Sequence, residues 1–195
     1  MTGPRLEEVN REMMQFGVAV PGGVEHVSLR ARTVHETGNW LVLVAWSNAL
    51  NTVRRTAVLP AVANCVPALT PLVAKFYGAR PADVSSRIDS GETRTIACSS
   101  GVRGPMGSAI FCLALRPGQK RFREEFEGGG VETFAYMDDV SLGLVGATAD
   151  TVRAFVFLQR ELEGIGIVVN TAKAVALPPK GARLDGGGHF APGKR

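Results

Sequence analysis

The chain has no long apolar run, and that absence excludes a membrane-spanning protein. Its longest apolar stretches, Trp40 to Trp46 and Ala109 to Leu115, are far too short to cross a bilayer. Acidic residues stand near the N-terminus, where a secretory signal would have its apolar core, so no targeting segment is evident. We therefore expect an intracellular protein, cytoplasmic or nuclear, that does not use a membrane as a partner.

Cysteine is scarce as well. The three cysteines, Cys65, Cys98 and Cys112, are odd in number, widely spaced and without a Cys-x-x-Cys pair. This pattern argues against a disulfide framework and against a zinc knuckle. We expect reduced thiols in the core and no disulfide-linked partner.

Charge of one sign is never concentrated in a block. The formal net charge is +4, and no run of five or more basic residues occurs in the 195-residue chain. Such mild basicity permits a nucleic-acid partner without requiring one. A hydrophobic content of 45% is enough for one sizeable core. The expected organisation is a helical N-terminal region over 1–36, a main domain over 37–177 and a disordered Pro/Gly-rich tail over 178–195.

The most informative stretch runs from Phe134 to Val145, where two adjacent acids, Asp138 and Asp139, stand between apolar residues. This pattern predicts two short buried strands joined by a tight turn, with both acids at its tip. Adjacent carboxylates repel each other, so a fold tolerates them best when they are exposed or face a cation. The residue chemistry leaves two interpretations open, a site for a hard divalent cation such as Mg²⁺ and an ordinary charged turn.

The apolar pattern of the whole chain predicts an α+β fold. Strands are expected near 41–45, 133–136, 140–144 and 165–169, in one antiparallel sheet. Helices are expected over 25–36, 53–64, 67–77, 107–116 and 149–163, with a second β-hairpin over 84–96 and a solvated helical face over 117–126. A Gly-rich loop from Ser99 to Ser108 is either a plain connector or a place where backbone closely approaches a substrate.

The tetrapeptide Tyr136-Met137-Asp138-Asp139 resembles the catalytic signature of reverse transcriptases. Three further segments resemble motifs of these enzymes: Asn48 to Val53 the end of the first catalytic motif, Ser99 to Ser108 the Gly-rich loop, and Gly164 to Lys173 the Gly-Leu-x-x-Asn-x-x-Lys motif. The Gln15-Phe16-Gly17 stretch and the Gly-rich turn after it resemble the fingers region. Because the motifs stand in the family's order, the chain resembles the palm and a fingers remnant of a non-LTR (LINE-like) retrotransposon reverse transcriptase.

The resemblance implies a polymerase palm, a ferredoxin-like antiparallel sheet backed by helices, with a partial fingers remnant. It implies template-directed nucleotidyl transfer by two metal ions, Mg²⁺ or Mn²⁺, with Asp138 and Asp139 as catalytic metal ligands. The lysine matching Lys173, otherwise a surface charge, lies near the triphosphate in the family and can donate a proton to the pyrophosphate leaving group. The implied partners are an RNA or DNA template-primer and a dNTP, and the positions matching nucleotide contacts are Tyr136, Leu50, Arg103 and Gly104.

Three departures from the family pattern concern the site itself. Ala45 stands where the first catalytic motif has aspartate, Leu50 where it has an aromatic residue, and Arg103 where the Gly-rich loop has glutamine. Nothing acidic between Val42 and Arg54 could replace the missing aspartate. The match, from about residue 15 to about residue 177, also leaves out the basic upstream fingers, a thumb, and any endonuclease or RNase H region. We expect polymerase activity to be lost or severely reduced, and the metal to be weakly bound.

Two other classes of protein remain as alternatives. A non-catalytic nucleic-acid-binding relic with an RRM-like sheet would need exposed aromatic residues on its strands, and only Tyr136 is a candidate. A nucleotidyl cyclase of related palm topology would carry a Gly-Gly-Asp/Glu-Glu-Phe hairpin, which the sequence lacks. The reverse-transcriptase-like palm is therefore the preferred hypothesis.

Overall fold

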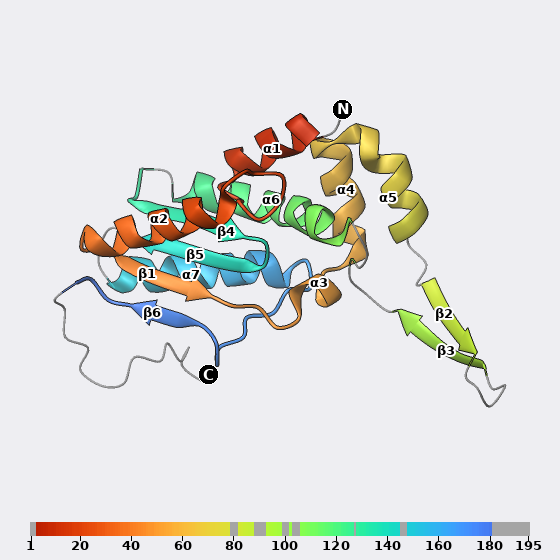
Figure 1. The fold of residues 1–195 in the computed structure, drawn as a ribbon. Coiled ribbons are helices and arrows are strands. Elements are labelled where there is room, and N and C mark those ends of the chain that lie inside the picture. The colour runs from red at the N-terminus through yellow and green to blue at the C-terminus, as the bar shows by residue number, and fades with distance from the viewer. Residues whose placement is uncertain are drawn as a thin grey trace.

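In the computed structural model, a four-stranded antiparallel sheet separates two groups of helices (Figure 1). The structure describes residues 3–78, 82–87, 93–98, 102, 106–126, 128–144 and 148–180. The strands are β1 (Trp40–Val44), β4 (Val131–Tyr136), β5 (Asp139–Leu144) and β6 (Val175–Leu177), in the order β4-β5-β1-β6. The predicted α+β fold class is confirmed.

The helices account for most of the remaining described residues. They are α1 (Gly3–Glu12), α2 (Gly23–Glu36), α3 (Ala49–Thr52), α4 (Arg55–Cys65), a short 3₁₀ turn η1 (Pro67–Leu69), α5 (Thr70–Tyr77), α6 (Gly107–Glu125) and α7 (Thr148–Glu163). A separate hairpin of β2 (Ala82–Arg87) and β3 (Thr93–Cys98) confirms the hairpin predicted over 84–96. No helix in the described part of the chain combines the length and the apolar character that a bilayer crossing requires.

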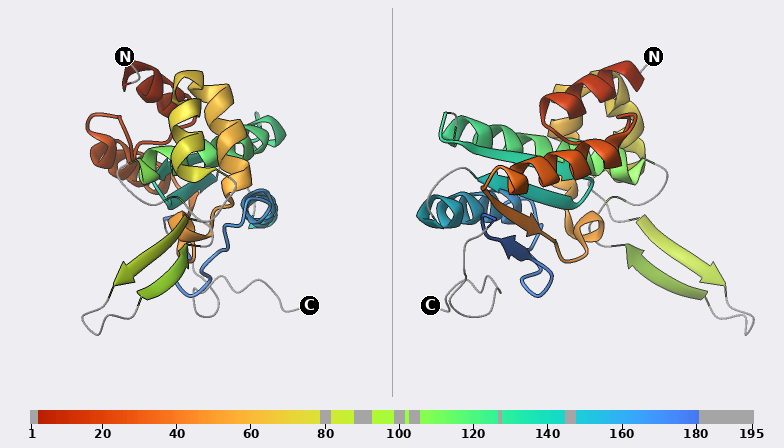
Figure 2. Two further views of the ribbon diagram at one scale, coloured as in Figure 1. Left: turned by 90° about the vertical axis from the view of Figure 1, so that its right-hand side faces the viewer. Right: turned by 60° about the vertical axis from the view of Figure 1, so that its left-hand side comes forward.

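Two apolar clusters hold the sheet between its helices. Val42 and Val44 of β1 point into the larger cluster, where they pack with α4, α6 and α7 through residues such as Phe111 and Phe155. On the other face α2 covers a smaller cluster, which consists of Phe16, Val20, Val34, Leu41 and Phe134. The end-on view in Figure 2 (left) shows α2 on one side of the sheet and α7 on the other. Both faces of β1 are therefore covered along much of the strand, and Leu43 is its exposed residue.

Helix α6 is longer than the sequence predicts. It passes through Pro117 and ends at Glu125, whereas the apolar pattern predicts an end near residue 116. Proline inside a helix removes one backbone hydrogen bond, but the turns beyond it bury Phe122, whose ring packs against those of Phe126 and Phe157. The charged residues between 117 and 126 are the solvent-facing side of this same helix.

The strand predicted over 165–169 is wrong. Ile165 and Ile167 donate their backbone N–H groups to the carbonyl oxygen of Leu162 at the end of α7, at 3.1 and 3.0 Å, which turns the chain instead of extending it. The segment contacts the region after β1 through an isolated bridge between Trp46 and Val169 and through single hydrogen bonds, such as the one of 2.8 Å from the N–H of Ser47 to the carbonyl oxygen of Val168. The edge of β1 pairs instead with β6, where Leu43 lies opposite Val175. The predicted disordered tail lies outside the described residues beyond residue 180.

Replacement of Phe134 by alanine should destabilise the fold strongly, because this side chain is fully buried in the cluster beneath α2. We expect the free energy of unfolding to fall by about 3–5 kcal/mol, measured by urea denaturation. Phe76→Ala on α5 is the matched control, because Phe76 is 61% exposed, and it should change the free energy by no more than about 0.5 kcal/mol. Equal losses for the two variants would show that the cluster beneath α2 is not a core.

Candidate active site

The two acids lie at the tip of the β4–β5 hairpin, as the sequence predicts. Tyr136 pairs with Asp139, so the loop between the strands consists of Met137 and Asp138 alone. Met137 has a φ of 54°, and two-residue hairpin loops of the II′ type give this position to glycine. Holding a non-glycine residue in the left-handed region costs about 1–2 kcal/mol. Other contacts must therefore stabilise the turn.

Ala45 follows β1 directly beside this turn. Val44 of β1 pairs with Val140 of β5, so the same register places Ala45 level with Asp139. Because Val44 and Val140 point into the larger cluster, the side chains of Ala45 and Asp139 project from the opposite face of the sheet. The position that resembles the missing catalytic aspartate thus adjoins the acidic pair, and it carries a methyl group.

The carboxylates of the acidic turn and their burial change the pKa values of groups around the turn. Burial and the neighbouring Asp138 carboxylate raise the pKa of Asp139 above its ordinary value, and the Lys173 ammonium group opposes this shift. On the side of α6, burial and the charge of Asp138 raise the pKa of the Cys112 thiol to about 12. The charge of Asp138 thus acts on a thiol of α6, and the charge of Lys173 acts on Asp139. Within the described ranges, no three His, Cys, Asp or Glu side chains form a group that could hold a metal ion.

The remaining predicted site residues lie in different parts of the structure. Tyr136 is half-buried against the cluster beneath α2, whereas Leu50 on α3 packs against the larger cluster. The carbonyl oxygen of Leu50 accepts a hydrogen bond of 2.8 Å from the N–H of Val102. Arg103 and Gly104 lie outside the described residues. The structure thus brings Tyr136, Asp138, Asp139 and Lys173 to one end of the sheet beside Ala45.

Sequence reasoning assigned no role to Gln15, which contacts the acidic turn. Its side chain is 1% exposed, and its Oε1 accepts hydrogen bonds from the N–H of Met137 (2.8 Å) and of Gly17 (3.1 Å). Its Nε2 donates to the carbonyl oxygen of Met137 at 3.0 Å. The only sequence signal was the Gln-aromatic-Gly stretch, which resembles a fingers segment and does not identify the partner.

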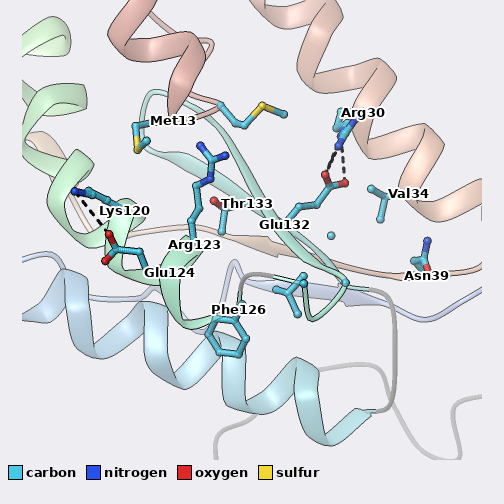
Figure 3. A pocket seen from close by; sticks show the side chains of 15 residues that line it. Met13, Arg30, Val34, Asn39, Lys120, Arg123, Glu124, Phe126, Glu132 and Thr133 are labelled. Atoms are coloured by element: carbon cyan, nitrogen blue, oxygen red, sulfur yellow. Dashed lines mark hydrogen bonds and ion pairs between the residues drawn. The ribbon is translucent and has the colours of Figure 1, made fainter.

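A cavity of about 670 Å³ lies at the other end of the β4–β5 hairpin, lined in part by Val131, Glu132, Thr133 and Gly143 (Figure 3). Its basic side chains are largely neutralised, since Arg30 pairs with Glu132 and Lys120 with Glu124 at 3.6 Å. None of the predicted site residues lines this cavity. We therefore place the candidate active site at the acidic turn.

Comparison with protein-family models and with curated proteins finds no match. Solved structures do match: telomerase from Candida tropicalis truncated from its C-terminal domain has a TM-score of 0.66 and 11% identity over 93% of this chain. Telomerase from Candida albicans in complex with a TWJ fragment of telomeric RNA has a TM-score of 0.68 and 10% identity over 92% of this chain. The chain spans 40% and 34% of these two telomerases. At such identities the likeness shows the fold, which is of the polymerase palm type.

Replacement of Asp139 by asparagine should raise the melting temperature at neutral pH in the absence of metal. The pKa of Asp139 is raised above its ordinary value of 3.8 in the folded protein, so its ionisation costs stability once the pH exceeds that range. The advantage of the variant should therefore shrink as the pH falls toward 3.8 and below.

Asp150→Asn is the matched control for thermal melting across this pH range. Asp150 lies in the first turn of α7, where negative charge is favourable to the helix dipole. Its loss should lower the melting temperature slightly at neutral pH. A variant at Asp139 that also melts lower at neutral pH would contradict the repulsion between the two acids.

Proposed function

We propose that this chain is the palm of a reverse-transcriptase-like nucleotidyl transferase whose two-metal centre is incomplete. One observation carries the proposal: Asp138 and Asp139 stand at the tip of a hairpin whose neighbouring strand places Ala45 beside them. The palm-type fold shared with telomerase, a reverse-transcriptase-related enzyme, supports it. The ordered motifs favour descent from a non-LTR retrotransposon.

The donor set at the turn suits Mg²⁺ or Mn²⁺, because hard divalent cations prefer carboxylate oxygens. Asp138 and Asp139 would hold the ion. Burial and the neighbouring Asp138 carboxylate raise the pKa of Asp139, and a cation would neutralise the charge of both carboxylates. When bound, such ions lower the pKa of an attacking hydroxyl and stabilise the leaving oxygen. Lys173 lies near enough to Asp139 to lower its pKa, and it would supply a positive charge or a proton to the triphosphate of a dNTP.

Ala45 limits what this site can do. Two dications about 4 Å apart require several carboxylates to balance their charge, and the methyl group of Ala45 contributes none. Leu50 and Arg103 also differ from the family residues that contact the nucleotide. We therefore propose weak metal binding and polymerase activity that is lost or severely reduced.

The proposed partners are an RNA or DNA template-primer and a dNTP. Two observations support these partners: matching telomerase structures contain a fragment of telomeric RNA, and the net charge of this chain is +4. Binding should be weak, because so modest a charge allows only a few phosphate contacts. It should decrease as salt is added, because each phosphate contact releases counterions.

A second candidate is a non-catalytic nucleic-acid-binding module. Leu43 and Val175 lie opposite each other on the sheet face that carries Asp139, and they are 37% and 39% exposed. An open apolar patch on a sheet would allow contact with bases, but neither residue is aromatic, and single-strand platforms depend on aromatic stacking. The metal-dependent palm is therefore preferred.

The substitution Ala45→Asp tests the proposal. A third carboxylate beside Asp139 should lower the melting temperature without metal, through like-charge repulsion. Mn²⁺ should reverse this loss, because a ligand that binds only the folded state stabilises it, by about 2.7 kcal/mol at one hundred times its Kd. DNA synthesis on a primed template should still not recover, since the nucleotide contacts remain altered.

The control is Val156→Asp, which adds the same charge on α7 at a side chain that is 52% exposed. Melting of this control should respond to Mn²⁺ no more than the parent protein does. An Ala45→Asp protein whose melting ignores Mn²⁺ would show that position 45 and the acidic pair do not form a metal site.

A further inference from the structure

The side chain of Gln15 is hydrogen-bonded to the turn that carries both acids. Its amide forms hydrogen bonds to the N–H and to the carbonyl oxygen of Met137, at 2.8 and 3.0 Å. The backbone adds two more bonds across the same edge, from Phe16 N–H to Ala135 O at 2.7 Å and from Ala135 N–H to Met14 O at 2.8 Å. The segment 14–16 therefore runs along the free edge of β4 up to the turn.

The turn needs such support for two reasons. Met137 has a positive φ, a conformation that an L-residue other than glycine adopts at a cost. Asp138 and Asp139 are adjacent carboxylates, and like charges so close together repel each other. Both effects favour other conformations of the loop, and in those the two carboxylates would not keep their present positions.

We infer that Gln15 is a positioning residue that holds Met137 in the left-handed conformation and thereby sets the carboxylates of Asp138 and Asp139 for a divalent cation. This inference rests on the proposed function, because it concerns the same metal site. Both polar atoms of the Gln15 amide are hydrogen-bonded to backbone groups. Gln15 acts through the backbone of Met137.

Further hydrogen bonds and close packing hold Gln15 in its position. Its backbone N–H donates to the carbonyl oxygen of Asn10 at 2.8 Å, and the Asn10 side chain, 2% exposed, donates to Val18 O at 2.8 Å. Gly17 completes the arrangement, because any β-carbon there would overlap the backbone nitrogen of Met137. Buried amides that are hydrogen-bonded in this way favour a single local geometry.

The experiment compares Mn²⁺ affinity, measured by calorimetric titration, between the parent protein and Gln15→Met. Loss of a group that orients metal ligands typically weakens binding by about 10–100-fold, and we expect a loss in that range. The control is Gln119→Met on α6, since Gln119 is equally buried at 1% exposure and its amide has no hydrogen-bond partner among the described residues. This control should bind Mn²⁺ as the parent does.

A second variant separates positioning from simple loss of stability. Glycine adopts a positive φ without strain, so Gln15→Met combined with Met137→Gly should recover Mn²⁺ affinity to within a few-fold of the parent. A purely structural role for Gln15 would give no such recovery. Affinity that is unchanged in Gln15→Met, or a double variant as weak as the single one, would overturn the inference and leave the proposed metal site standing.

Hydrogen exchange at the Met137 amide tests the hydrogen bond between Met137 and Gln15 in the absence of metal. The exchange should accelerate in Gln15→Met and stay slow in Gln119→Met, because only Gln15 accepts that hydrogen bond. Equal exchange in both variants would overturn the inference. A parent protein that binds no Mn²⁺ would instead overturn the proposed function, together with any positioning of the acids for a cation.

Discussion

The antiparallel pairing of β5 with both β4 and β1 is the constraint on which the site depends. One register places Tyr136 opposite Asp139 and the other places Val44 opposite Val140. Because strand side chains alternate, these registers set Asp139 and Ala45 on one face, away from the larger core. A slip of one residue would bury the acid in the apolar cluster and remove the site.

The proposed site differs from a three-aspartate centre in the charge that it provides. The hairpin provides two carboxylates and the structure supports them with a buried amide from Gln15. The backbone of Ala45 is hydrogen-bonded, since its carbonyl oxygen accepts a bond of 2.8 Å from the N–H of Asn170. The side chain of Ala45 has no oxygen that could bind a cation. A palm-type scaffold thus does not need an acid at position 45, because the fold depends on apolar burial and strand pairing that this side chain does not provide.

The sequence predicts what local patterns determine and misses what distant contacts decide. The acidic hairpin was predictable because apolar residues flank Asp138 and Asp139 on both sides. The sequence could not predict whether the segment 165–169 or β6 pairs with β1, since both are short and apolar. Hydrogen bonds to the carbonyl oxygen of Leu162, at the end of α7, turn the segment 165–169 away from a strand conformation. The role of Gln15 could not be predicted either, because its partner Met137 is 122 residues away and a buried glutamine resembles an exposed one in sequence.

Calorimetric titration with Mn²⁺ of the parent protein, and of the protein with Asp138→Asn and Asp139→Asn, tests the central claim most directly. The central claim is that these two carboxylates form a cation site at the tip of the hairpin. Weak binding of Mn²⁺ by the parent and none by the double variant is the predicted result. Equal binding by both proteins, or no binding by the parent, would contradict it.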